Sequence, residues 1–315
     1  MTTLTPAFAQ YSFSPIDYPN SGNTTSAFGI NNAGVVTGNY VDPGTSLTTG
    51  FVYSTNGGYT SVAVPSALGT SLGAINAGGV AVGTYETTNN TIRSFTYDGS
   101  SITLLADYPG EGVTETSAYG INTAGTIVGV TSSNASFIPF SGFQLTGGVY
   151  TPYNYAGAVS TGLLGINDSG AIVGNYFDTN SVSFGFLLPT GLDSTPVAVN
   201  FPGAASTWPV SINNLGHIAG FYEDWDNIGH GFVLSEGSYT TVDYPGDPGL
   251  SPVIAGETGT FLWQINDQGQ LAGTYNNYSN GFVASVVPEP STYALVLLGA
   301  GAVYVWRRRK RLNRR

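Results

Sequence analysis

The sequence predicts an all-β protein: a six-bladed β-propeller of four-stranded blades, closed by an N-terminal strand and followed by one C-terminal transmembrane helix. Three observations support this fold class: one short pattern recurs six times, the composition is rich in turn and strand formers, and a spare strand precedes the first repeat. The chain has 315 residues, of which 41% are apolar and 9% charged, with 44 Gly and no Cys. Gly together with β-branched and aromatic residues is typical of short strands joined by tight turns.

The repeated pattern is Ile-Asn-x-x-Gly-x-φ-x-Gly-x-Tyr, where φ is an apolar residue, and Thr131 replaces the Tyr in the third copy. The copies begin at Ile30, Ile75, Ile121, Ile166, Ile212 and Ile265. Asn bonds local backbone and Gly adopts positive φ, so Asn followed three residues later by Gly predicts a tight turn between two strands.

Two further strands complete each repeat. A third strand begins at an aromatic residue, and the six residues are Phe51, Phe95, Phe143, Phe186, Phe232 and Phe282. A fourth strand ends in apolar–x–aromatic–Pro at 106–109, 199–202 and 242–245, with Val-Ala-Val-Pro in the same place at 62–65 and Tyr-Asn-Tyr-Ala at 153–156 as a degenerate form. Four strands in each repeat, at a spacing of about 40–50 residues, are typical of a propeller blade.

The sixth repeat lacks a fourth strand, because its third strand at 281–285 runs directly into a Pro-Glu-Pro segment. Ahead of the first repeat, residues 13–19 end in Ile16-Asp17-Tyr18-Pro19, which matches the fourth-strand ending. We predict that this N-terminal strand completes the last blade and removes open sheet edges, so that residues 11–286 form one propeller. An open β-solenoid is the alternative, although it would not need a displaced strand.

The basic residues gather at the C-terminus: seven of the eight are Arg307, Arg308, Arg309, Lys310, Arg311, Arg314 and Arg315. Residues 1–306 therefore hold one cation, Arg93, against all 19 acidic residues, a formal charge of −18. So acidic a body repels phosphate backbones, and we expect no nucleic-acid partner. The absence of Cys excludes disulfides, thiolate metal sites and a Cys nucleophile.

Residues 291–306, just before this basic end at 307–315, carry no charge. As a helix they would be about 24 Å long, close to the thickness of a hydrocarbon core, and we predict a transmembrane helix. Arg307, Arg308, Arg309, Lys310 and Arg311 would stop transfer and remain cytoplasmic, with everything N-terminal to the helix outside. A buried core helix is the alternative, but it would have no use for the terminal cations.

Ahead of the helix stand Pro288, Glu289 and Pro290, which make a stiff, extended spacer. Pro-Glu-Pro, an apolar segment and a terminal Arg run together resemble the PEP-CTERM sorting signal of exported bacterial proteins, so residues 287–315 would be the sorting tail. The resemblance implies recognition and removal by an exosortase, and an outer envelope with exopolysaccharide. The protein would be membrane-anchored before processing and at the cell surface or extracellular afterwards. The same region is also catalogued as an ice-binding protein C-terminal domain, which by itself does not imply ice binding.

Residues 1–10 are expected to be the remnant of a signal peptide. Ala7-Phe8-Ala9 before Gln10 fits a small-residue cleavage site, whereas the basic and apolar regions of a complete signal peptide are missing. The hypothesis is that the true start lies upstream.

The repeats over residues 11–285 resemble the HAF family of bacterial extracellular repeats, which carries similar Gly-Ile-Asn-x-x-Gly and His-Gly/Ala-Phe segments. Here only His230-Gly231-Phe232 keeps the histidine. The family implies no catalytic chemistry for this chain.

The densest acidic group is Glu223, Asp224 and Asp226 around Trp225, in the predicted loop after the second strand of the fifth blade. A solvated acidic loop is the plain interpretation. A Ca²⁺ loop or a sugar-stacking site are the functional alternatives, and Trp208 and Trp263 would either stack on a sugar or pack between blades. We expect His217 and His230 to be structural, and we predict no catalytic residue and no cofactor.

These observations favour an exported, non-enzymatic binding or structural protein linked to exopolysaccharide or a biofilm matrix. The alternative is a propeller glycoside hydrolase or lyase that uses paired carboxylates such as Asp224 and Asp226. A convergent carboxylate pair across the central channel would favour the enzyme, and carboxylates confined to outer loops would favour the binding protein. Ice or surface adhesion ranks last, because Thr48-Thr49 and Thr87-Thr88 do not recur in register.

Overall fold

The computed structural model describes residues 10–21, 24–133, 139–246, 259–276 and 278–287. These residues form 24 strands and no helix, which confirms the all-β class. The chain divides into two compact units, a larger one of Phe13–Ala284 and a smaller one of Met1–Ser12 with Ser285–Arg315. In the described part of the smaller unit, the Ser12 hydroxyl donates a hydrogen bond to the Ser285 carbonyl oxygen at 3.3 Å.

The strands group in fours that we call blades one to six. Blade one contains β2 (Thr25–Ile30), β3 (Val36–Val41), β4 (Thr48–Ser54) and β5 (Gly58–Val62), and blade two β6 (Gly69–Ile75), β7 (Ala81–Glu86), β8 (Ile92–Tyr97) and β9 (Ile102–Leu104). Blade three contains β10 (Glu115–Ile121), β11 (Ile127–Ser132), β12 (Ser141–Thr146) and β13 (Val149–Tyr153), and blade four β14 (Ser160–Ile166), β15 (Ile172–Phe177), β16 (Ser183–Leu188) and β17 (Val197–Ala198). Blade five contains β18 (Ser206–Ile212), β19 (Ile218–Glu223), β20 (Gly229–Ser235) and β21 (Ser238–Thr241).

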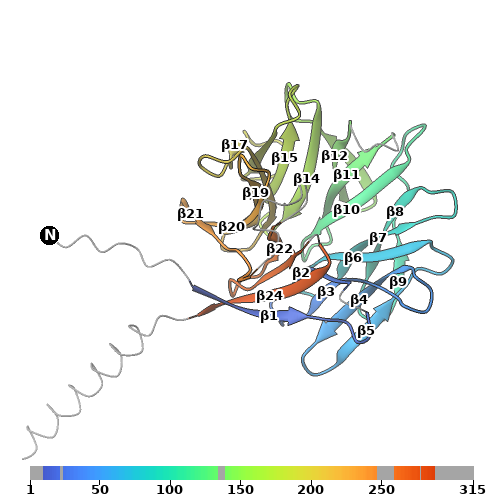
Figure 1. The fold of residues 1–315 in the computed structure, drawn as a ribbon. Helices are drawn as coiled ribbons and strands as arrows, with labels where there is room; N and C mark the ends of the chain where they lie inside the picture. Colours follow the sequence, from blue (N-terminus) through green and yellow to red (C-terminus); the bar gives the residue numbers. More distant parts are fainter. Residues whose placement is uncertain (1–9, 22–23, 134–138, 247–258, 277, 288–315) are drawn as a thin grey trace, which may run out of the picture. The chain divides into compact units, whose positions relative to one another are not determined.

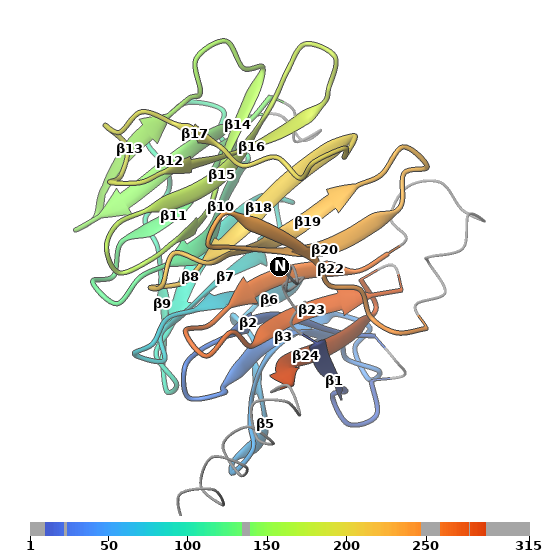
Figure 2. The ribbon, with the colours of Figure 1, turned by 90° about the vertical axis from the view of Figure 1, so that its left-hand side faces the viewer.

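Blade six consists of β22 (Phe261–Ile265), β23 (Leu271–Tyr275) and β24 (Asn280–Val287), and β1 (Gln10–Ile16) pairs with β24 as the sequence predicts. Figures 1 and 2 show the blades following one another around a common centre in chain order, from blue to orange. Blade six returns to blade one, where Thr25 forms a parallel bridge with Asn280. A second such bridge joins Glu115 to Ile92 between blades three and two. The two bridges are the reason why two sheets count eight strands each.

The predicted turn after each Ile-Asn is confirmed. In blade one the Asn31 side-chain oxygen accepts hydrogen bonds from the backbone N–H groups of Ala33 and Val35, both at 3.0 Å. The first Gly of the pattern has positive φ in every copy, namely Gly34, Gly79, Gly125, Gly170, Gly216 and Gly269. An L side chain is strained in this conformation, so the turn selects glycine.

The second Gly of the pattern has a different role, which is close packing. Gly83 lies opposite Phe95 on the neighbouring strand. A Cβ at Gly83 would lie 2.5 Å from both the Phe95 ring and the Ser71 carbonyl oxygen. All six third-strand Phe side chains are fully buried. Each blade therefore packs its buried third-strand Phe ring over a glycine of its second strand.

The fourth strands end earlier than the sequence analysis placed them, before or at the first residue of the apolar–x–aromatic–Pro segment. At four of the six junctions the aromatic ring of this segment lies against the next blade and stacks on the Tyr that closes the repeat pattern. Ring centroids lie 3.6–4.0 Å apart in the pairs Tyr18–Tyr40, Tyr155–Tyr176, Phe201–Tyr222 and Tyr244–Tyr275. Tyr18 makes the same stack as the others, so the N-terminal segment occupies the place of a fourth strand.

The junction between blades two and three departs from this scheme. At the other five junctions a Thr hydroxyl, in the first strand or directly before it, accepts a hydrogen bond from a backbone N–H group in the segment that follows the preceding blade. The equivalent hydroxyl, Thr116 Oγ1, is buried and has no hydrogen-bond partner. The same junction holds Thr131 in place of the stacking Tyr and contains Arg93, whose Nε lies 2.6 Å from Asp107 Oδ1.

Candidate functional site

The acidic segment of blade five, residues 223–226, begins at Glu223, the last residue of β19, and Asp224, Trp225 and Asp226 lie in the loop that leads to β20. Asp224 Oδ1 accepts hydrogen bonds from the backbone N–H groups of Asp226 and Ile228, both at 2.9 Å. Burial opposes ionisation, but these bonds and His230 hold the pKa of Asp224 below its ordinary value. Asp178 closes the corresponding turn of blade four in the same way. Asp224 thus has a structural role in its own loop.

Trp225 is the most exposed large side chain of this loop, at 80% of its maximal area. Its indole Nε1 donates a hydrogen bond to the Gly203 carbonyl oxygen at 3.1 Å, which fixes the ring while leaving it open to solvent. Beside it, burial and the charge of Asp224 raise the pKa of Glu223. A fixed, exposed indole is a surface on which a sugar ring can stack.

His230 ties this loop to the segment after β21. Its Nδ1 lies 2.9 Å from Asp243 Oδ2, its Nε2 lies 3.5 Å from Asp224 Oδ2, and its ring stacks on Tyr222. The hydrogen bond with Asp243 and the charges of both aspartates raise the pKa of His230, although burial works against the rise. The pairing favours the imidazolium form.

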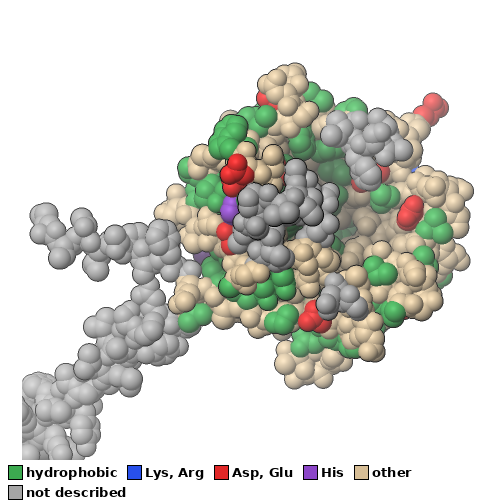
Figure 3. Space-filling view, in the orientation of Figure 1, with side chains coloured by type: hydrophobic (Ala, Val, Ile, Leu, Met, Phe, Trp, Pro, Cys, Tyr) green, Lys and Arg blue, Asp and Glu red, His purple; other side chains and the backbone are tan. Residues whose placement is uncertain are grey.

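Within the described ranges, no group of three or more His, Cys, Asp or Glu side chains could hold a metal ion. Figure 3 shows a few acidic side chains scattered over one face of the molecule, most of which is uncharged. The Ca²⁺ loop stays a prediction, because no third carboxylate of the described residues joins Asp224 and Asp226 in a cation-binding group.

The narrow end of the central channel is built by the Asn of each repeat. Five of these side chains donate an Nδ2–H bond of 2.9–3.2 Å to the backbone oxygen of the Asn in the next blade, in the order Asn76, Asn122, Asn167, Asn213, Asn266 and Asn31. Beside them, Asn214 donates to Asp168 and Asp267, at 2.9 and 3.1 Å. The sequence analysis did not predict this cross-blade role. The signal that could have indicated it is the presence of Asn in all six copies, although a turn accepts other residues.

Gln264 narrows the middle of the channel. The position just before the repeat Ile is small in the other copies, namely Gly29, Ala74, Gly120, Gly165 and Ser211. Gln264 Oε1 accepts from the backbone N–H groups of Ile30 and Ile75, at 2.9 and 3.1 Å, and Nε2 donates to the Ile75 oxygen at 2.9 Å. The space at this level is about 20 Å³. The sequence analysis also did not predict the role of Gln264. The signal that could have indicated it is a long side chain at a position where the other five copies have a small residue.

The wide end of the channel is an aromatic cavity of about 270 Å³, which adjoins a second one of about 250 Å³. Its aromatic walls are Tyr119, Phe140, Phe177, Trp208, Phe221 and Trp263. Trp208 and Trp263, which the sequence assigned either to a sugar or to packing, line this cavity, and Trp208 also stacks on Phe221 with centroids 4.9 Å apart.

Among the described lining residues of these two cavities there is one carboxylate, Glu115. It is 4% exposed, and its Oε1 accepts a hydrogen bond from Ser117 Oγ at 2.7 Å. Burial raises the pKa of Glu115. Retaining and inverting glycosidases both need two carboxyl groups that face each other. These lining residues do not include such a pair.

Comparison with known protein families concerns the tail. Residues 286–310 match the PEP-CTERM protein-sorting motif. This motif implies export, sorting by an exosortase, and a membrane-anchored C-terminus before processing. Pro288, Glu289, Pro290, the predicted transmembrane helix at 291–306 and the basic end lie outside the described residues, as does nearly all of the predicted signal-peptide remnant. Within the described residues no helix has the length and apolar character that a membrane crossing requires.

Comparison with solved structures shows the fold. TolB from Acinetobacter baumannii is 12% identical with a TM-score of 0.55, and the match covers 79% of this chain and 63% of that one. A putative TolB from Agrobacterium tumefaciens is 10% identical with a TM-score of 0.55, over 90% of this chain and 100% of that one. A fungal lectin from Aleuria aurantia, described as a six-bladed β-propeller, is 13% identical with a TM-score of 0.51, over 80% and 88% of the two chains. These likenesses establish a β-propeller fold. No curated protein matches the sequence.

Proposed function

We propose that this protein is an exported β-propeller whose tail is cut by an exosortase, and whose body binds glycan at the cell surface or in an exopolysaccharide matrix without catalysis. The observation that carries the proposal is the sorting motif at residues 286–310, which begins within the last strand of the propeller. In this proposal Pro288, Glu289 and Pro290 are the recognised motif, and Arg307–Arg311 hold the tail in the membrane until it is removed.

The glycan-binding part of the proposal rests on Trp225. Its ring is exposed and fixed by the hydrogen bond to Gly203, and the neighbouring Glu223, Asp224 and Asp226 offer acceptors for sugar hydroxyls. A propeller of this fold, the Aleuria aurantia lectin, has been solved in complex with Fucα1-6GlcNAc. The glycoside hydrolase or lyase remains the second candidate, but the carboxylates Asp224 and Asp226 stand on an outer loop, where a binding role is favoured.

The sorting proposal is tested by mass spectrometry of the mature C-terminus in the native host, with and without the exosortase. We expect loss of everything after about Pro288–Ser291 only when the exosortase is present. An intact tail in both strains would contradict sorting and leave a membrane-anchored propeller.

The glycan proposal is tested on a glycan array with the Trp225→Ala variant. Because aromatic contacts contribute about 0.5–1.5 kcal/mol beyond buried area, we expect binding to weaken roughly tenfold. Trp263→Leu, which changes the channel cavity and not the loop, is the matched comparison. Equal binding by wild type and Trp225→Ala would exclude this loop.

A further inference from the structure

The wide end of the channel contains a buried acid at a position where the other repeats have small, uncharged residues. Glu115 stands six residues before the repeat Ile, and its equivalents are Thr24, Gly69, Ser160, Ser206 and Gly259. The side chain is 4% exposed and lines the aromatic cavity. Among the described residues, its carboxylate accepts a hydrogen bond from the neutral Ser117 hydroxyl. A buried carboxylate is costly unless a cation or several hydrogen bonds compensate it.

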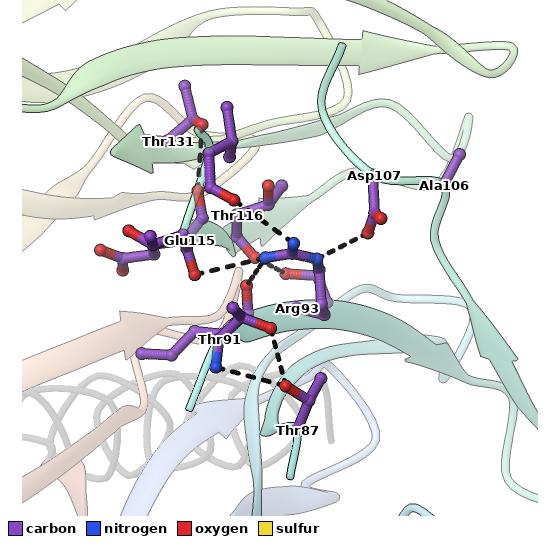
Figure 4. A network of polar contacts seen from close by, with 12 residues as sticks. Thr87, Thr91, Arg93, Ala106, Asp107, Glu115, Thr116 and Thr131 are labelled. Carbon is purple, nitrogen blue, oxygen red and sulfur yellow. Dashed lines mark hydrogen bonds and ion pairs between the residues drawn. The ribbon is translucent and has the colours of Figure 1, made fainter. Parts of the chain in front are cut away.

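The part of the chain that the structure describes does not provide that cation. Arg93 is the sole Lys or Arg within residues 10–287. Its guanidinium binds Asp107 and donates to the Ile92 and Thr114 carbonyl oxygens. Figure 4 shows the Glu115 carboxylate pointing away from this guanidinium. Within the described residues, Glu115 therefore lacks a positively charged partner.

The walls around Glu115 suit a cation that has an apolar body. Trp208, Trp263 and Tyr119 line the same cavity, and Trp faces attract cations most strongly among aromatic rings. Desolvation of its hydroxyl and the charge of Glu115 raise the pKa of Tyr119 to about 12, so this partly exposed ring stays a neutral phenol. The formal charge of −18 on residues 1–306 concentrates cations near the protein.

We propose that this cavity binds an organic ammonium ion, with its charge against Glu115 and its carbon groups against Trp208, Trp263 and Tyr119. The volume of about 270 Å³ accommodates a small ligand or the end of a larger one. At the level of Gln264, next to the cavity, the open space in the channel is only about 20 Å³. The ligand therefore enters from the wide end. Two sources share this chemistry, a small quaternary ammonium compound and the primary ammonium of a de-N-acetylated amino sugar.

The test is isothermal titration calorimetry of the full chain in a non-ionic polyoxyethylene detergent. The probes are choline with its neutral isostere 3,3-dimethylbutan-1-ol, and a glucosamine oligomer with its N-acetylated counterpart. We expect at least one ammonium probe to bind roughly tenfold or more tightly than its neutral counterpart. The preferred ammonium probe identifies the source. Equal affinity within both pairs, or binding of neither ammonium probe, would overturn the proposal.

The variant Glu115→Gln keeps the shape of the side chain and removes its charge. We expect ammonium binding to weaken roughly tenfold or more and binding of the neutral isostere to be unchanged. Glu111→Gln removes the same charge from an exposed position four residues earlier and serves as the matched control. Circular dichroism verifies that both variants fold. Unchanged ammonium affinity in folded Glu115→Gln would contradict the assignment, as would an equal loss in both variants.

Discussion

His230 links two segments of blade five through Asp243 and Asp224, and its protonation sets the strength of that link. The pKa of His230 is raised in the folded state, so the stabilisation is fully present below its unfolded value of about 6.5 and is lost as pH rises through the folded pKa. We predict that His230→Gln destabilises the protein at about pH 5.5, where hydrogen bonds to charged groups contribute about 1.5–3 kcal/mol, and much less at about pH 8.5.

Thermal unfolding of both proteins across this pH range measures the difference. In an Asp243→Asn background, which removes the main cause of the raised pKa, the pH dependence of the His230→Gln effect should shrink. A constant effect at all pH values would show that ring packing, and not charge, is what His230 contributes.

The packing around Gly83 leaves no room for a Cβ atom. A Cβ there would lie 2.5 Å from the Phe95 ring and from the Ser71 backbone, and a shift of the backbone costs free energy. We predict that Gly83→Ala destabilises the protein by about 1–3 kcal/mol, the usual cost of overpacking. Gly73→Ala, on the neighbouring strand, has its nearest neighbour at 3.6 Å and should change stability little. Denaturant unfolding compares the two, and an equal loss would refute the packing argument.

At the scale of elements, β1 protects the edge of β24. Removing residues 1–16 leaves the unpaired N–H and C=O groups of β24 open to another chain, and exposed edges associate. We predict dimers or larger species of this variant by size-exclusion chromatography. Removal of residues 1–9 alone, which leaves β1 intact, should give the same elution volume as the full chain. Identical elution of all three proteins would mean that β1 has no protective role.

The elements that the sequence predicted best are those fixed by local chemistry. The Asn–Gly turns, the buried third-strand Phe residues and the displaced strand ending at Tyr18 each follow from residue types a few positions apart. The channel could not be derived in this way. Gln264, Tyr119 and Glu115 occupy variable positions of the repeat, and their meaning appears only when six first strands converge on one axis.

At the scale of the whole molecule, charge opposes compactness. One Arg against 19 acidic residues in 1–306 produces self-repulsion that salt screens. We predict that raising NaCl from about 10 to 300 mM at neutral pH raises the melting temperature by roughly 2 °C, equivalent to about 1 kcal/mol of relieved repulsion. Differential scanning calorimetry measures the shift. Near pH 4, where about half of the carboxylates are protonated, the same salt should have less effect. An equal shift at both pH values would exclude relief of repulsion as its cause.

The pairing of β1 with β24 also fixes when the protein can finish folding. A chain exported N-terminus first presents β1 on the far side of the membrane at the outset and its partner last, immediately before the sorting motif. Five blades can assemble during transit, but the ring stays open until translocation is nearly complete. The ring therefore closes at about the time when the sorting motif is exported. A chain truncated during export would lack both its last strand and its sorting motif.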